Sequence, residues 1–341
     1  MRVIAPDYYD RFQCLAGECP HSCCEKWEVV IDEGHACRYE EVPSPLGEKL
    51  RTALQRDEDG DFCFSLNGGR CPFLDEENLC EIHRQLGEEA TSITCQEHPR
   101  FTEDYGSFRE ITLSASCPAA NALLLGTEEP LTFRELETDE PGEEGDGWLE
   151  YLVPLRARLL EGLTDRAVPL RRRLKEFLML ASDVQECLDD DDLEGISTLL
   201  RTWHPWELTE DERVVPLFPR ALRCLGELEI LEPDWKALLT QAEAVPEERM
   251  PEPLLERIAV YMGFRYLLKA VNDGDLLSRA QLVVFTVLLV ERLAAVCGLG
   301  EALRRFSCEI EHNDENLEAL MECFWMEEAL SLEGMLRELR A

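Results

Sequence analysis

The sequence predicts a mainly α-helical protein, in which an irregular cysteine-rich N-terminal domain is followed by an all-α helical domain. Ten of its 15 cysteines lie within the first 117 residues. Beyond residue 148, apolar residues recur at helical spacing. Between these two parts, residues 127–147 are acidic and contain proline and glycine, as a linker does. We therefore expect a cysteine-rich domain at 1–126, an acidic linker at 127–147 and a helical domain at 148–341.

The N-terminal domain has only short apolar segments. Residues 27–31 (WEVVI) and 109–113 (REITL) alternate with period two, which predicts strands. The glycines at 68 and 69 follow Asn67 and predict a turn. Pro118 is suited to the start of a helix over 119–125. These short elements predict an irregular fold for this part of the chain.

The helical domain is predicted from the spacing of its apolar residues. Helices are expected at 149–161, 168–187, 193–203, 215–231, 235–244, 252–271, 275–297 and 316–339. The longest apolar run, QLVVFTVLLV at 281–290, is too short to cross a bilayer and predicts a buried helix. We therefore expect a domain of seven or eight helices.

Charge and the lack of a targeting segment narrow the partners and the compartment. The formal net charge of −37 disfavours nucleic acid, because phosphate binding needs a basic surface. The same field attracts basic proteins, and it also serves solubility. The N-terminal residues lack the apolar run of a signal peptide, so we expect a cytoplasmic protein without membrane contact. Because disulfides are rare in that compartment, the early cysteines are expected to bind metal.

Eight of the early cysteines are the candidate metal ligands. Their spacing is uneven, two are adjacent, and no CxxC pair occurs, which favours an iron–sulfur cluster over zinc. The CxxxCxxC spacing of radical enzymes is absent, because Lys26 stands where the third cysteine belongs. Which four of the eight bind is left open. The candidates are Cys14, Cys19, Cys23, Cys24, Cys71, Cys80, Cys95 and Cys117.

The residues around these cysteines resemble the flagellin lysine N-methylase family, over about residues 1–125. The resemblance lies in Tyr8-Tyr9, Phe12, the cysteines at 14–24, Trp27, Cys71-Pro72-Phe73-Leu74, Leu79-Cys80, Leu86-Gly87, Thr94-Cys95, Pro99-Arg100 and Leu113-Ser114 with Ser116-Cys117-Pro118. It implies a cytoplasmic bacterial enzyme that transfers methyl groups from S-adenosylmethionine to lysine ε-amines, with flagellin as the expected substrate. It also implies a [4Fe–4S] cluster in the cysteine-rich domain, with S-adenosylmethionine as the second cofactor.

The implied reaction suggests roles for five residues near the cysteines. A lysine must lose its proton before it attacks a sulfonium methyl, so a base or a desolvated pocket is required. Glu110, Tyr8 and Tyr9 are the candidate catalytic residues, and Arg100 and Trp27 the candidate cofactor-binding residues; an arginine can clamp a carboxylate with two hydrogen bonds. The competing interpretation is packing for the aromatic residues and an ion pair between Arg100 and Glu110.

Two questions stay open from the sequence. The cluster either leaves one iron open for S-adenosylmethionine, with three thiolate ligands, or braces the fold with four. The alternative to an enzyme is a non-catalytic cysteine-rich module that binds metal or an iron–sulfur cluster and grips a protein partner; a protein that uses the cluster for electron transfer is a third hypothesis. In the enzyme hypothesis, the partner is flagellin or another lysine-bearing protein.

Overall fold

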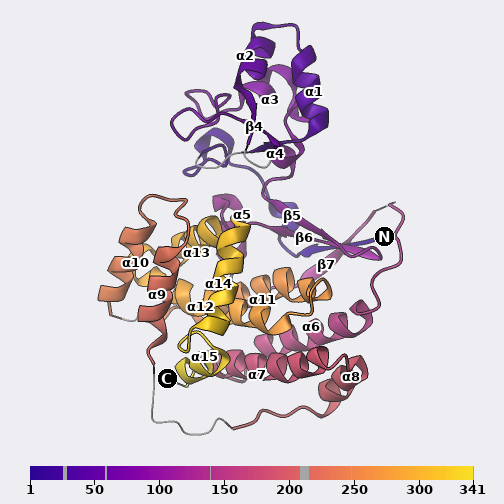
Figure 1. Cartoon of the computed structure of the whole chain (residues 1–341), viewed down its shortest axis with the longest axis vertical. Coiled ribbons are helices and arrows are strands. Elements are labelled where there is room, and N and C mark those ends of the chain that lie inside the picture. Colours follow the sequence, from indigo (N-terminus) through magenta and orange to yellow (C-terminus); the bar gives the residue numbers. More distant parts are fainter. Residues whose placement is uncertain (26–28, 58–59, 139, 208–214, 247, 341) are drawn as a thin grey trace. The chain divides into compact units, whose positions relative to one another are not determined.

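The computed structural model describes residues 1–25, 29–57, 60–138, 140–207, 215–246 and 248–340 (Figure 1). Its contacts divide the chain into two compact units. The thiol unit is Arg11–Phe101 with Leu113–Asn121, and the helical unit is Met1–Asp10, Thr102–Thr112 and Ala122–Ala341. The chain passes between the two units after residues 10, 101, 112 and 121.

The thiol unit has a small apolar core between two helices and a sheet. Helices α1 (Glu33–Glu41) and α2 (Pro45–Ala53) are each capped by the residue before them, Asp32 and Ser44, whose side chains accept from backbone N–H groups. Strands β2 (Val30–Ile31), β4 (Phe62–Phe64) and β3 (Leu54–Arg56) form an antiparallel sheet in that order. The core residues are Val29, Ile31, Ala36, Tyr39, Leu46, Leu50, Phe64, Phe73 and Ile82.

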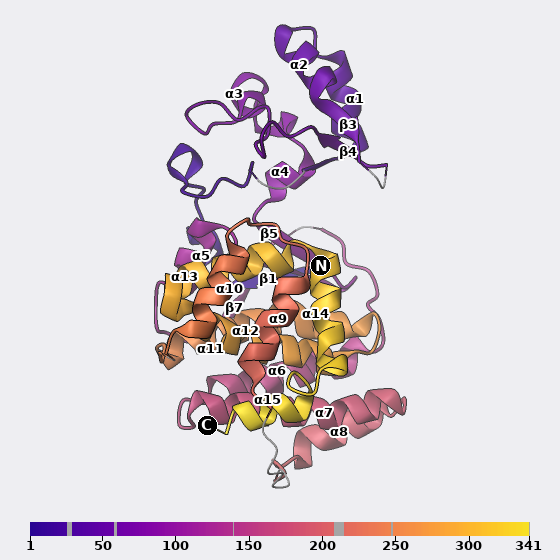
Figure 2. The same cartoon turned by 60° about the vertical axis from the view of Figure 1, so that its left-hand side comes forward.

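Short helices complete the cysteine-bearing segments (Figure 2). They are η1 (Tyr9–Arg11), η2 (Ala16–Glu18), α3 (Glu81–Leu86), η3 (Glu88–Ala90), α4 (Ile93–Glu97) and α5 (Pro118–Leu125). The helix predicted at 119–125 is confirmed as α5, with Pro118 at its start. Strand β2 keeps only the last two residues of the strand predicted at 27–31, and 27–28 lie outside the described residues.

A four-stranded sheet joins segments that are far apart in the sequence. Its order is β5 (Arg100–Asp104), β6 (Phe108–Leu113), β1 (Arg2–Pro6) and β7 (Phe133–Leu136). Strand β1 pairs parallel to β6 and antiparallel to β7. The strand predicted at 109–113 is therefore confirmed as β6. Strand β7 lies within the stretch predicted as an acidic linker, and the division predicted at 127–147 stays a prediction.

The helical unit is built around one long apolar helix, α12 (Leu276–Cys297). Helices α7, α10, α11, α13, α14 and α15 all contact it. Alone among the described helices, α12 is long and apolar enough to span a membrane, but 78% of that window is buried inside the protein. This burial confirms the predicted core helix. The surrounding elements are α6 (Leu149–Thr164), α7 (Leu170–Asp189), α8 (Leu193–Thr202), α9 (Leu217–Glu227), α10 (Trp235–Ala244), α11 (Glu252–Tyr266), η4 (Leu267–Val271), α13 (Leu299–Phe306), the π-helical η5 (Ser307–Glu311), α14 (Asp314–Met326) and α15 (Leu332–Glu338).

The mainly α-helical class is confirmed, and two details of the prediction are corrected. The helix predicted at 316–339 is two helices, because Glu327 ends α14 and the Ser331 side chain caps α15 by accepting from Gly334 N–H. The N-terminal part is more regular than predicted, since α1 and α2 are helices of nine residues each.

Candidate functional site

All eight candidate cysteines lie in the thiol unit, and each has a free thiol. They come from four separate segments. Cys14 and Cys19 flank η2, Cys23 and Cys24 follow it, and Cys95 lies within α4. Cys71 and Cys80 lie before α3, and Cys117 directly precedes α5. The fold therefore collects in one unit the thiols that the sequence distributes over about a hundred residues.

Backbone contacts connect the segments that carry Cys24, Cys71 and Cys80. The N–H of Cys71 donates to the carbonyl of Cys24 at 2.8 Å. Leu74 forms a β-bridge with Cys80, and the side chains of Cys71 and Cys80 both pack against the apolar core of the unit. Ser92 Oγ accepts from the N–H of Cys95 at 3.2 Å. Cys24, Cys71 and Cys80 are thus held close together by the main chain.

The first cysteines are held by local hydrogen bonds. The Cys14 sulfur accepts from the N–H of Ala16 at 3.3 Å, and the Cys19 thiol donates to the carbonyl of His21 at 3.1 Å.

The N–H of Cys117 donates to Ser114 O at 3.2 Å. Burial is the main cause that raises the pKa of Cys117, and the neighbouring Cys19 and Cys14 raise it further.

The thiols affect one another's protonation. A hydrogen bond from the Cys23 thiol lowers the pKa of Cys24 to about 7, while the pKa of Cys23 is raised. Burial raises the pKa of Cys71 to about 12 and that of Cys95 to about 11, and nearby thiols add to both shifts. Without a cation, gathering several thiolates here is therefore unfavourable. A bound metal reverses this preference, because metal binding displaces the protons of its thiol ligands.

The donor chemistry fits an iron–sulfur cluster. Cluster ligation requires several thiols that are not in disulfides and that lie in one compact unit, and the thiol unit provides them. Among the residues that the structure describes, no three Cys, His, Asp or Glu side chains already converge as metal ligands. The fit to a cluster therefore depends on the number of free thiols and on their location in one unit. Among the described residues, the side chains are not already arranged around a metal position.

Of the candidate catalytic aromatic residues, Tyr8 is fully buried in the helical unit. Its hydroxyl has no hydrogen-bond partner among the described atoms, and burial raises its pKa above the ordinary value. The phenol is therefore protonated at neutral pH. Tyr9 is half-buried at the start of η1. Trp27, a candidate cofactor-binding residue, lies outside the described residues.

Glu110 forms an ion pair with Arg156. The residue is 3% exposed in β6, and its two carboxylate oxygens accept from Arg156 at 2.5 and 2.6 Å. Burial raises the pKa of Glu110, and Arg156 opposes this shift. Arg100 lies with its guanidinium 5.6 Å from the centre of the Phe12 ring. The observed partner of Glu110 is thus a residue of α6, where the sequence suggested Arg100.

A buried polar network in the helical unit was missed in the sequence. Arg265 donates to Thr112 Oγ1 at 3.1 Å and pairs with Glu311 at 2.9 Å, and Tyr266 donates to the same Glu311 oxygen at 3.1 Å. Glu311 ends η5, and π-helical turns frequently occur at functional sites. Burial, reinforced by the charge of Arg265, lowers the pKa of the neighbouring His312 to about 4. No spacing motif in the sequence predicts that these residues form a network.

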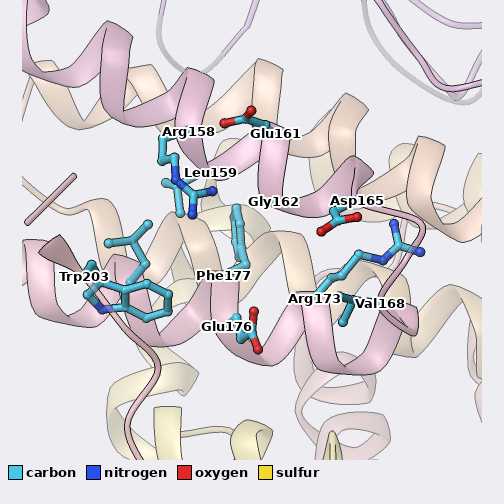
Figure 3. A pocket seen from close by; sticks show the side chains of 11 residues that line it. Arg158, Leu159, Glu161, Gly162, Asp165, Val168, Arg173, Glu176, Phe177 and Trp203 are labelled. Atoms are coloured by element: carbon cyan, nitrogen blue, oxygen red, sulfur yellow. The ribbon is translucent and has the colours of Figure 1, made fainter. Parts of the chain in front are cut away.

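A groove with a volume of about 420 Å³ opens between α6 and α7 (Figure 3). It was also missed in the sequence, since its lining comes from three segments of the helical unit. Its lining combines both signs of charge with aromatic side chains. Its charged and aromatic lining residues include Arg158, Glu161, Asp165, Arg173, Phe177 and Trp203.

The folded chain thus combines a cysteine-rich unit with a helical unit, and part of it is similar to proteins named as methylases. It is 27% identical over 145 residues to the Lysine-N-methylase of Salmonella typhimurium (strain LT2) and 26% identical over 145 residues to the Flagellar biosynthetic protein FliU of Salmonella muenchen. The Lysine-N-methylase of Salmonella choleraesuis is 25% identical over 139 residues. These matches confirm the resemblance to the flagellin lysine N-methylase family for the part of the chain that they cover.

The extent of these matches is limited. Each covers 39% of this chain, and they span 35% of each Lysine-N-methylase and 82% of the flagellar protein. No protein-family model matches the chain. No solved structure matches it either.

Proposed function

We propose that the protein transfers methyl groups from S-adenosylmethionine to lysine ε-amines of a protein, with flagellin as the first candidate substrate and a [4Fe–4S] cluster in the thiol unit. The observation that carries the proposal is the similarity to two proteins named Lysine-N-methylase and to a flagellar biosynthetic protein. The free thiols of the thiol unit support the cluster.

Four of the eight cysteines would hold the cluster, or three if one iron is left open for S-adenosylmethionine. A bound [4Fe–4S] cluster supplies either an open iron that binds an amino-acid group or a rigid brace for its domain. The pKa of Cys24 is lowered to about 7 by the hydrogen bond from the Cys23 thiol, which favours the thiolate form that binds metal.

The methyl transfer itself requires a neutral lysine close to a sulfonium. The structure limits how two of the candidate catalytic residues could accept the lysine proton. Tyr8 is buried and protonated, so its phenol can donate a hydrogen bond and cannot act as a base at neutral pH. Glu110 can accept a proton only after its ion pair with Arg156 opens. The acidic surface adds long-range attraction for a lysine-rich partner.

The proposal is tested with protein purified without oxygen. We expect a brown protein that contains iron and acid-labile sulfide, and that moves the labelled methyl group of S-adenosylmethionine onto purified flagellin. Flagellin whose lysines have been acetylated is the matched control and should accept no label. A colourless, zinc-containing protein would remove the cluster from the proposal. An intact cluster without methyl transfer to any lysine-bearing protein would favour the non-catalytic module.

A further inference from the structure

The groove between α6 and α7 has one aromatic side. Trp203 forms a wall, and Phe177, which is buried, lines the interior (Figure 3). The Trp203 indole N–H donates to Asp183 Oδ2 at 2.5 Å, which fixes the orientation of the ring. The neighbouring Trp206 donates to the other oxygen of the same carboxylate at 3.2 Å, but it does not line the groove. A fixed, partly exposed indole beside a cavity is a stacking surface for a planar ring.

The other side of the groove carries unbalanced charges. Arg158, Glu161 and Asp165 lie on or directly after α6, and none of them forms an ion pair within the described part of the chain. Arg173 is deeper, with a side chain 3% exposed; its Nη1 pairs with Glu256 at 2.6 Å, and its Nε has no hydrogen-bond partner there. The carboxylate of Asp165 accepts from Ala167 N–H at 3.1 Å. The unpaired cation of Arg158 beside the carboxylates of Glu161 and Asp165 is complementary to a zwitterion.

Gly162 keeps the groove open. It lies within α6 between the charged residues and Phe177 (Figure 3). Glycine inside a helix is less stable than alanine, so helix stability does not explain its use at this position. A Cβ at this position would meet the Arg158 guanidinium at 3.5 Å, and a longer side chain would enter the space beyond. The volume of about 420 Å³ falls within the range of small-molecule sites.

We infer that this groove binds S-adenosylmethionine, with the adenine against Trp203 and Phe177 and the amino-acid head group between Arg158 and the carboxylates of Glu161 and Asp165. The inference rests on the proposed function, in which this molecule donates the methyl group. S-adenosylmethionine joins a planar base to a zwitterionic amino acid, which is the combination that the lining accommodates. Its head group is then bound by side chains of the helical unit.

The inference is tested by calorimetric titration with S-adenosylhomocysteine, which binds without reacting. Loss of one base-stacking aromatic ring costs about 1–3 kcal/mol, so we expect Trp203→Ala to weaken binding by about tenfold or more. Arg158→Ala should weaken it similarly, and Gly162→Leu should abolish it by filling the groove. The matched controls are Trp206→Ala, which shares the Asp183 partner, and Arg201→Ala on the exposed face of α8; both should bind within about twofold of the wild type.

Two further measurements separate the possible outcomes. Iron and sulfide contents of all variants should equal those of the wild type, and circular dichroism should show unchanged helix content. If the wild type binds the ligand and methylates lysine while the groove variants bind equally well, the inference is wrong and the proposed function stands. If the wild type neither binds the ligand nor transfers methyl groups, the proposed function fails and this use of the groove fails with it.

Discussion

The two units of this chain differ in what can hold them together. In the helical unit, α12 alone buries 18 of its 22 residues. The apolar core cluster of the thiol unit comprises nine buried residues, beside ten free thiols, of which eight are the candidate ligands. Small cores supply little stability, and small domains commonly add a metal or a cross-link. The comparison predicts that apolar burial suffices for the helical unit, whereas the thiol unit would depend on the proposed cluster for its stability.

The largest expected effect is metal removal. Because binding energy at a metal site is also folding energy, chelation of iron should unfold the thiol unit and leave the helical unit folded. Limited proteolysis followed by mass spectrometry should then show cleavage within residues 11–101 and protection of 149–202 and 252–297. Among single Cys→Ser variants of the eight candidates, those that remove a cluster ligand should behave like the chelated protein. Cys37→Ser, at an exposed cysteine outside the eight, should behave like the wild type. Equal protection of both regions after chelation would show that the thiol unit stays folded without metal.

The next effect concerns the buried ion pair of the helical unit. Arg156→Ala leaves the Glu110 carboxylate buried without its partner and should lower the free energy of unfolding by about 3–5 kcal/mol. Urea unfolding followed by circular dichroism measures this loss. The double variant Glu110→Leu with Arg156→Met should recover most of it, since two apolar side chains leave no unpaired charge. A loss as large in the double variant as in Arg156→Ala would show that packing, and not charge, is responsible.

A smaller effect depends on pH through His312. Its pKa falls from an ordinary 6.5 to about 4 in the folded protein, so the unfolded chain binds the proton more tightly. The contribution to stability is complete above pH 6.5 and is lost as the pH falls from there toward 4, by up to about 3 kcal/mol. Urea unfolding at pH 7 and at pH 4.5 should show a smaller difference for His312→Gln than for the wild type. An unchanged difference would locate the pH dependence elsewhere.

The smallest effect lies at the start of α1. The Asp32 side chain accepts from His35 N–H at 3.0 Å and from Ile93 N–H at 3.1 Å, so it joins α1 to the helix that carries Cys95. Although burial opposes it, these hydrogen bonds hold the pKa of Asp32 at about 2. Asp32→Ala should cost about 1 kcal/mol, and this contribution of Asp32 should be lost as the pH falls from 3.8 toward 2. Thermal unfolding of the metal-loaded protein measures the change. Asp32→Asn should restore part of it, because its side-chain oxygen still accepts.

Local patterns in the sequence predicted most helices of the helical unit, because apolar spacing reports which face of a helix is buried. They missed α1 and α2 of the thiol unit and joined α14 and α15 into one helix. They also predicted that the early cysteines share one unit. They did not predict that β1 pairs with β6, more than a hundred residues away, since no local pattern encodes a non-local register. The partner of Glu110 was missed for the same reason: Arg156 lies 46 residues further on and looks like any surface arginine in its own helix.

The division of the chain has a consequence for assembly. Residues 11–101 are inserted between β1 and most of β5, so the four-stranded sheet closes a loop that contains nearly the whole thiol unit. When that loop is unfolded, closing the sheet costs the conformational entropy of about ninety flexible residues. If the thiol unit folds around the proposed cluster, its two chain ends are already fixed when the sheet forms. Iron supply would then control how readily β1 pairs with its neighbouring strands in the four-stranded sheet.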